Sequence, residues 1–157
     1  MYVRGDGVAQ DYTRAADLFL QAAELGLKEA MTNLGVLYEN GFGVPQSDDI
    51  AADLYRRGGR AEGVPSDIDL IYDTRLAPPP QDENGIRVLA VAAKAGDPVA
   101  QFQLAWLLLS PQANQPREAA VLMERAAKSG HGPSMANLGI LYFQGRGVPQ
   151  DYILAQM

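Results

Sequence analysis

Three glycine-rich loops are the first part of the sequence whose residue types could do chemistry. They read Gly5-x-Gly7, Gly41-x-Gly43 and Gly145-x-Gly147, each with a glutamine three residues after the second glycine. A dinucleotide-binding loop needs glycine at that sixth position and a strand before the loop. Here a helical pattern comes before each loop instead. We therefore interpret the loops as turns, in which two glycines allow positive φ, and predict no nucleotide cofactor.

The sequence motifs give as little support for a metal site or a catalytic site. Asp67-x-Asp69 could begin a calcium loop, but Ile71 and Tyr72 stand where that loop needs a ligand and a glycine. His131 is the only histidine, and we expect it on the surface at a helix boundary. No serine is followed three residues later by lysine, as a Ser-x-x-Lys nucleophile requires. The sequence thus predicts no catalytic residue, no metal site, no cofactor and no enzymatic activity.

The composition excludes several kinds of partner. The 157 residues carry a net charge of −6 and give a pI near 4.7. Nucleic-acid binders usually have a basic patch that neutralises phosphates, so we expect no nucleic-acid partner. No run of about 18 apolar residues could span a membrane, and no leader is visible, which leaves the compartment open. The chain has no cysteine, which excludes disulfides and thiolate zinc sites.

The chain is built from repeats. Residues 30–47 return almost unchanged as residues 134–151, and the end of the same pattern opens the chain at residues 1–11. A unit used repeatedly at this spacing indicates a solenoid. Helical apolar spacing, glycine C-caps and Asp or Ser N-caps place the elements. We expect helices over 12–25, 28–40, 48–57, 66–76 (a divergent copy), 84–95, 97–109, 117–129, 133–144 and from 151 onward.

The repeat pattern resembles a known family. It reads A-x-x-x-L-G-x-L-Y-x-x-G-x-G-V-P-Q-D-Y, then A-A-x-L-F-x-x-A-A-x-x-G, and it is similar to the Sel-one-like repeat, a relative of the tetratricopeptide repeat. The match is close over 30–58 and 126–152 and poor over 59–83. The resemblance implies an all-α fold, an α/α right-handed superhelical solenoid of antiparallel helix pairs. In it, the first helix of each pair, the A helix, lines the concave side.

The resemblance also implies an organisation and a role. The expected organisation is a single array over residues 1–157, with a partial repeat at 1–26, repeats at about 27–62, 63–96 and 97–130, and a partial repeat at 131–157. Members of the family act as adaptors that organise complexes, for example in bacterial envelope biogenesis and exopolysaccharide control. The partner implied is another protein or an extended peptide.

A second stripe on the A helices is the candidate binding site. It lies away from the core stripe and in most copies places uncharged hydrogen-bonding side chains around an apolar centre. Amides can pair with the backbone of an extended peptide, and apolar positions can hold its side chains. The predicted partner-binding residues are Asn33, Val36, Asn40, Tyr72, Gln103, Trp106, Ser110, Asn137, Ile140 and Gln144. The alternative is that these residues pack between neighbouring A helices.

Two functions fit these patterns. The favoured one is a protein- or peptide-binding adaptor that uses the concave face. The alternative is a structural spacer or assembly module that acts through end-to-end packing. Repeat arrays normally end in a polar capping helix, but apolar residues stand at both ends here, namely Tyr2, Val8, Tyr152, Ile153 and Leu154. These uncovered faces predict self-association or fraying, and a place in a longer array.

Overall fold

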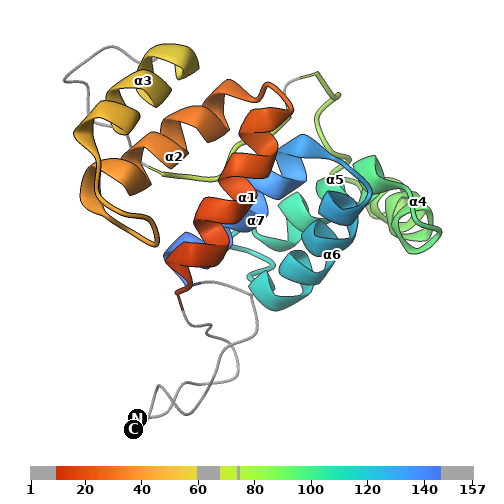
Figure 1. Cartoon of the computed structure of the whole chain (residues 1–157). Coiled ribbons are helices and arrows are strands. Elements are labelled where there is room, and N and C mark those ends of the chain that lie inside the picture. The colour runs from red at the N-terminus through yellow and green to blue at the C-terminus, as the bar shows by residue number, and fades with distance from the viewer. Residues whose placement is uncertain (1–9, 60–67, 74, 146–157) are drawn as a thin grey trace, which may run out of the picture.

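A computed structural model describes residues 10–59, 68–73 and 75–145 of the chain (Figure 1). This described part contains helices and no strand, which confirms the all-α fold class. Each helix agrees with an expected one to within a residue at either end. None of these described helices is long and apolar enough to cross a membrane. The helices are α1 (Tyr12–Glu24), α2 (Lys28–Asn40), α3 (Asp48–Gly58), α4 (Glu83–Lys94), α5 (Pro98–Leu108), α6 (Pro116–Lys128) and α7 (Gly132–Gln144).

Local signals fix the helix ends. The Asp11 carboxylate accepts a 2.9 Å hydrogen bond from the backbone N–H of Arg14 at the start of α1. The Ser47 hydroxyl accepts one of 3.2 Å from the N–H of Ile50 at the start of α3. These bonds satisfy amides that a first helical turn leaves unpaired. After α2 the backbone turns left-handed at Gly41, with φ of 71°, which suits a residue without a Cβ.

The helices stack in an order that differs from their order along the chain. In space, α4 packs on α5, α5 on α6, α6 on α7, α7 on α1, α1 on α2, and α2 on α3. Figure 1 shows α1 against α7, with α2 and α3 to one side of this pair and α6, α5 and α4 to the other. The array is therefore α4–α5–α6–α7–α1–α2–α3. The residues between α3 and α4 connect its two outer ends.

The helix expected over residues 66–76 is wrong. Residues 68–73 are extended, and residues 75–77 begin with a turn and a bend. We call residues 68–73 and 75–77 together the crossing segment (yellow-green in Figure 1). Ile68 and Leu70 pack into the core whereas Asp69 between them is exposed. Apolar contacts therefore alternate with the period of two that extended chain has. The prolines that follow, Pro78–Pro80, also keep the chain extended.

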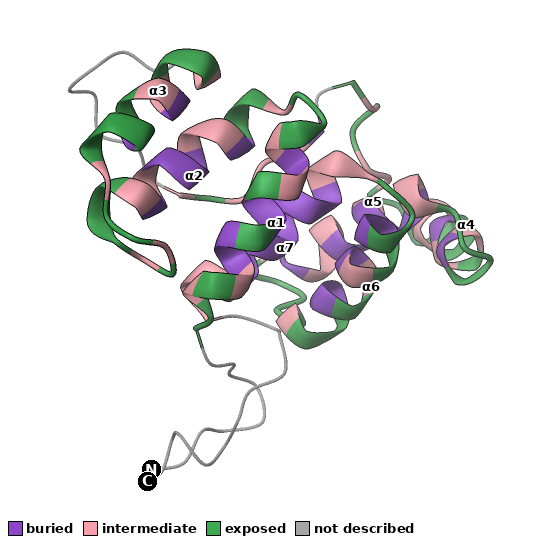
Figure 2. Cartoon of the chain, in the orientation of Figure 1, coloured by how far each residue is buried: buried purple, intermediate pink, exposed green. Residues whose placement is uncertain are grey.

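Small residues let neighbouring helices approach closely. A Cβ added to Gly35 of α2 would lie 2.6 Å from Cε1 of Tyr55 in α3. A Cβ added to Gly139 of α7 would lie 2.8 Å from Cε1 of Phe19 in α1. Real Cβ atoms do not come this close, so glycine is required for the observed spacing. Every helix of the stack contains buried residues (purple in Figure 2), as expected when each helix pair must cover its neighbour's apolar face.

Several expectations concern residues outside the described part. The helix expected from residue 151 and the apolar ends at Tyr2, Val8 and residues 152–154 belong here. The repeat boundaries given above remain predictions.

Candidate protein-interaction site

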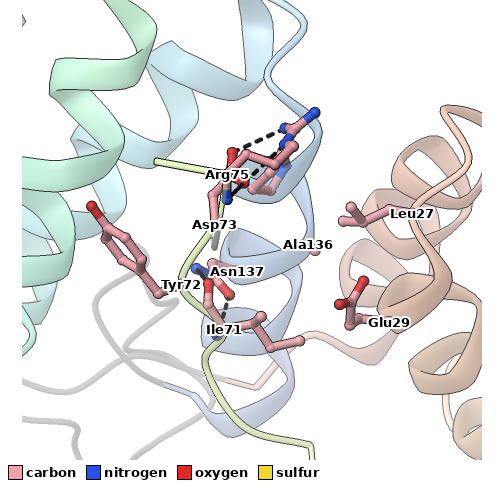
Figure 3. Close-up of a pocket in the computed structure, with 9 residues that line it drawn as sticks. Leu27, Glu29, Ile71, Tyr72, Asp73, Arg75, Ala136 and Asn137 are labelled. Atoms are coloured by element: carbon pink, nitrogen blue, oxygen red, sulfur yellow. Dashed lines mark hydrogen bonds and ion pairs between the residues drawn. The ribbon is translucent and has the colours of Figure 1, made fainter. Parts of the chain in front are cut away.

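The centre of the candidate site is a side chain that holds an extended backbone. Asn137 of α7 donates from Nδ2 to the carbonyl of Ile71 at 2.7 Å, and its Oδ1 accepts from the N–H of Ile71 at 2.9 Å (Figure 3). Asn137 has no exposed surface. One amide thus satisfies both backbone groups of one residue, as a neighbouring β-strand would. This is the chemistry predicted for the stripe, and the extended chain bound here is the protein's own crossing segment.

Other amides of the stripe reinforce this contact. Gln144 lies seven residues after Asn137 on α7 and donates from Nε2 to the carbonyl of Ile68 at 3.1 Å. Gln103 of α5 donates from Nε2 to the Tyr72 hydroxyl at 3.0 Å and to the carbonyl of Ala77 at 3.3 Å. The Tyr72 hydroxyl itself donates to the Ala77 carbonyl at 2.6 Å. The crossing segment is therefore held by side chains of α5 and α7, which are both A helices of the repeat.

An aromatic cluster receives the side chain that follows Ile71. The ring of Tyr72 lies 5.2 Å from the Trp106 ring, edge to face, and 5.5 Å from the Phe102 ring. Edge-to-face and tilted arrangements at these separations are the favoured ones for aromatic pairs. Trp106 is half-buried and Phe102 is fully buried. The cluster receives the aromatic side chain of Tyr72, whereas the hydrogen bonds of Asn137 and Gln144 described above go to backbone groups.

The remaining stripe residues fall into different environments. Asn33 of α2 is buried, and its Nδ2 has no hydrogen-bond partner. Val36 and Ser110 are half-buried, and Asn40 is exposed, with its Nδ2 bonded to the Val36 carbonyl at 2.9 Å. Ile140 is fully buried in the core beside Leu34 and Leu37. It therefore lies in a helix–helix contact in this structure and not on an open surface, and the partner-binding role of the stripe stays a prediction.

The structure corrects the expectation for His131. We expected it on the surface, but its side chain is only 11% exposed. Its Nδ1 lies 2.6 Å from the Ser134 hydroxyl, and its ring lies 5.1 Å from that of Phe102. Burial lowers the pKa of His131 and outweighs the nearby Asp73 carboxylate, whose Oδ2 is 3.7 Å from Nε2. Periodicity gave no sign of this, because the crossing segment that lies against His131 does not follow the repeat.

A small cavity opens beside the crossing segment. Its volume is about 220 Å³ and it lies between the starts of α2 and α7, with Leu27, Glu29 and Ala136 among its lining residues (Figure 3). Its polar lining residues include Asp73 and Arg75 together with Glu29 and Asn137. Arg75 donates from Nε to Oδ1 and from Nη2 to Oδ2 of Asp73, both at 2.9 Å, and these bonds lower the pKa of the Asp73 carboxyl. In the described part of the chain no group of three or more His, Asp or Glu side chains could hold a metal ion.

Comparison with known proteins agrees with this architecture. The profile of the Sel1 repeat matches residues 1–27, 28–69, 98–131 and 132–157. The chain belongs to the Sel1 repeat family. Sel1 repeat proteins usually mediate protein–protein interactions and are generally not enzymes. The Sel1 profile leaves residues 70–97 unmatched, and these hold most of the crossing segment and α4.

A curated relative also carries a description. This Sel1 repeat chain is similar to an exopolysaccharide production negative regulator of Rhizobium leguminosarum bv. viciae. The two are 30% identical over 145 residues, which is 91% of this chain and 47% of the relative. The chain therefore spans about half the length of that regulator.

Proposed function

We propose that this Sel1 repeat protein is an adaptor that binds an extended segment of a partner protein on the face formed by α2, α5 and α7. The observation that carries the proposal is the pair of hydrogen bonds between the Asn137 amide and the backbone of Ile71. A buried side chain that both donates to and accepts from the backbone of one extended residue is suited to recognise a peptide, whatever its sequence.

The contacts around Asn137 define the chemistry of the partner. Asn137 and Gln144 read backbone carbonyls and an N–H, so they require an extended conformation. The Phe102–Trp106 pair receives an aromatic ring one residue after the residue that Asn137 holds. The core edge next to α2 receives apolar side chains at the positions of Ile68 and Leu70. The expected partner segment is therefore extended, apolar at alternate residues and aromatic at its far end.

The partner's segment would take the place of the crossing segment, because one amide cannot serve two backbones. A competitor in the same chain acts at a high effective concentration, which is on the order of millimolar for a short flexible tether. A partner therefore has to make further contacts along the array to succeed. The half-buried and exposed residues Val36 and Asn40 on α2 continue the same face and supply room for them.

A displacement experiment tests the proposal. Ile71→Pro removes the N–H that donates to Asn137, and Tyr72→Ala removes the aromatic anchor. The double variant should release the crossing segment, which the fluorescence of Trp106, the only tryptophan, should report as a change in emission. A synthetic peptide with the sequence of residues 66–77 should then bind the double variant and restore the emission.

The controls decide what the binding means. The same peptide with proline in place of Ile71 should bind at least tenfold more weakly, and the wild-type protein should bind the natural peptide weakly because its own segment competes. If the double variant binds neither peptide, the proposal is contradicted.

The description of the relative fits a role of this kind. A negative regulator can act by holding another protein, without catalysing a reaction. We propose that the present chain likewise acts on a pathway through the protein it binds.

A further inference from the structure

The contact between α7 and α1 reproduces the contact between α2 and α3. In the second pair, which a short loop joins, the N–H of Ser47 donates to the carbonyl of Tyr38 at 2.9 Å. In the first pair, the N–H of Asp11 donates to the carbonyl of Tyr142 at 3.0 Å. Asp11 is the repeat equivalent of Ser47, and Tyr142 that of Tyr38.

The flanking side chains repeat this correspondence. Gln46 donates from Nε2 to the carbonyl of Glu39 at 3.2 Å, and its equivalent Gln10 donates from Nε2 to the carbonyl of Phe143 at 3.0 Å. Two independent hydrogen bonds therefore recur with equivalent donors and acceptors. The α7–α1 contact is a genuine repeat junction in its geometry.

The packing between the helices repeats as well. Gly35 of α2 makes room for the ring of Tyr55, and Gly139 of α7 makes room for the ring of Phe19. Phe19 and Tyr55 are equivalent residues of α1 and α3. Arg14 of α1 adds an ion pair to Glu124 of α6, with Nη2 and Oε2 3.3 Å apart.

One difference separates the two junctions. A loop of six residues, 42–47 after the Gly41 cap, joins α2 to α3, but no short connection joins α7 to α1. The unit α1–α3 is tied to the unit α4–α7 only by residues 59–82, and residues 68–73 and 75–77 of this connection are already held on α5 and α7. Residues 59–67 come before the held part, which is 67 − 58 = 9 residues. Nine residues can extend to about 30 Å at roughly 3.3 Å per residue. The helix that docks on α7 is therefore not required by local connectivity to come from the same chain.

We propose that α7 also accepts α1 from a second copy of this chain, so that two copies exchange their α1–α3 units and form a two-fold dimer. The exchanged junction uses the same hydrogen bonds, the same glycine and the same aromatic ring as the internal one. Exchange of an identical element needs no new complementary surface, and this makes it a low-cost route to a dimer. The balance between the two forms then depends on protein concentration and on the connecting residues. Ile68 and Leu70 of the crossing segment pack against the core clusters that contain Leu18, Phe19 and Ile140 of this junction, so an exchanged α1 also has to fit beside the crossing segment.

A complementation experiment tests the exchange. Gly139→Leu should block the receiving helix, because even a Cβ there meets the Phe19 ring. Leu18→Asp should block the docking helix, because Leu18 is 2% exposed and its Cβ lies 3.3 Å from a Cβ built at Gly139. Each single variant keeps one intact half of the junction. Mixed in equal amounts, the two variants should form a one-to-one complex of twice the 16.9 kDa mass in light scattering.

The controls separate exchange from nonspecific association. Leu20→Asp makes the same change on the outer face of α1, where the side chain is 47% exposed, and should leave the wild-type behaviour unchanged. Leu18→Asp mixed with a chain that carries both blocking substitutions should form no complex, because that mixture contains no intact α1. A mixture of the two single variants that keeps its helical circular dichroism and stays at monomer mass overturns the proposal.

A second measurement needs no substitution and covers the case in which a blocked variant does not fold. Wild-type chains with two different tags are unfolded together and refolded at rising concentration. The fraction in which one tag captures the other should rise with concentration, and chains refolded separately and mixed afterwards should exchange much more slowly. Tags that never copurify after joint refolding at millimolar concentration would also overturn the proposal.

Discussion

Asn33 and Asn137 occupy the same position of the repeat on α2 and α7, but their amides differ in what they bond. Asn137 pairs with both backbone groups of Ile71, whereas Nδ2 of Asn33 is buried without a hydrogen-bond partner. Both residues have 5% exposure or less. The two positions therefore form a natural comparison, in which burial is similar and hydrogen bonding is not.

Asn137→Ala is expected to destabilise the fold more than Asn33→Ala. Loss of Asn137 leaves the N–H and the carbonyl of Ile71 unpaired, and because Ile71 is half-buried each group should cost at most the about 1–3 kcal/mol of a fully buried unsatisfied group. Loss of Asn33 removes an amide whose buried Nδ2 bonds nothing, so the substitution leaves no partner of that nitrogen unpaired and should cost less than Asn137→Ala. Urea unfolding of both variants measures the difference. Equal losses would show that hydrogen bonding to Ile71 contributes no net stability.

A methyl group at Gly139 is expected to cost more than one at Gly35. Each meets an aromatic ring, Phe19 or Tyr55, at 2.8 Å or less. Phe19 is fully buried and cannot move aside, whereas Tyr55 is half-buried near the outer end of the array. Overpacking of a rigid core typically costs about 1–3 kcal/mol. We expect Gly139→Ala to fall in this range and Gly35→Ala below it in thermal and urea unfolding. The reverse order would show that the α7–α1 contact yields more easily than α2–α3.

The regular part of the fold was predictable because its signals are local. Caps such as Asp11 and glycines such as Gly41 act within one turn of the helix they end, so the sequence places helix boundaries to within a residue. The order of stacking was not predictable. An A helix such as α7 can pair with any helix that carries the matching half of the repeat, and local periodicity does not say which one does so.

The candidate site was predictable in its chemistry and not in its occupant. The stripe identified Asn137 and Gln144 as amides suited to extended backbone, and they do hold such a backbone. When the sequence is aligned with the neighbouring repeats, Leu70 and Tyr72 align with residues of helices. This alignment is why we expected a helix over residues 66–76. The backbone of this segment finds its partners on distant helices, and every backbone group needs a partner wherever it comes from. Only the tertiary structure shows that these backbone groups bond side chains of distant helices instead of one another.

The Tyr72–Trp106 pair should contribute a measurable coupling energy. Their rings meet edge to face at 5.2 Å, and such pairs typically contribute about 0.5–1.5 kcal/mol beyond area burial. Trp106 is only half-buried, so Trp106→Ala should cost less than the roughly 3–5 kcal/mol of a deleted core aromatic. A double-mutant cycle with Tyr72→Ala and Trp106→Ala in urea unfolding gives the coupling. Additive losses would mean that the two rings do not stabilise each other.

Acidification should weaken the fold through His131. Burial lowers its pKa below the value near 6.5 that the unfolded chain should show, while the neighbouring Asp73 acts in the opposite direction and Arg75 in the same one. As the pH falls through about 6.5, the unfolded chain binds a proton that the folded chain still excludes, so the free energy of unfolding decreases. Asp73 does not contribute in this range, because its pKa is lowered from an already acidic value and its stabilising effect is lost only at much lower pH.

Urea unfolding at pH 7.5 and pH 5.5 measures this effect. His131 is the only histidine, so the comparison between wild type and His131→Asn isolates its contribution, with Asp97 as the other charged group that influences it. The wild-type protein should lose stability between the two pH values, and the variant should lose distinctly less. The neutral variant keeps a polar side chain beside Ser134, which limits its own cost at pH 7.5. A wild-type protein that becomes more stable at pH 5.5 would mean that attraction between the imidazolium and Asp73 outweighs burial.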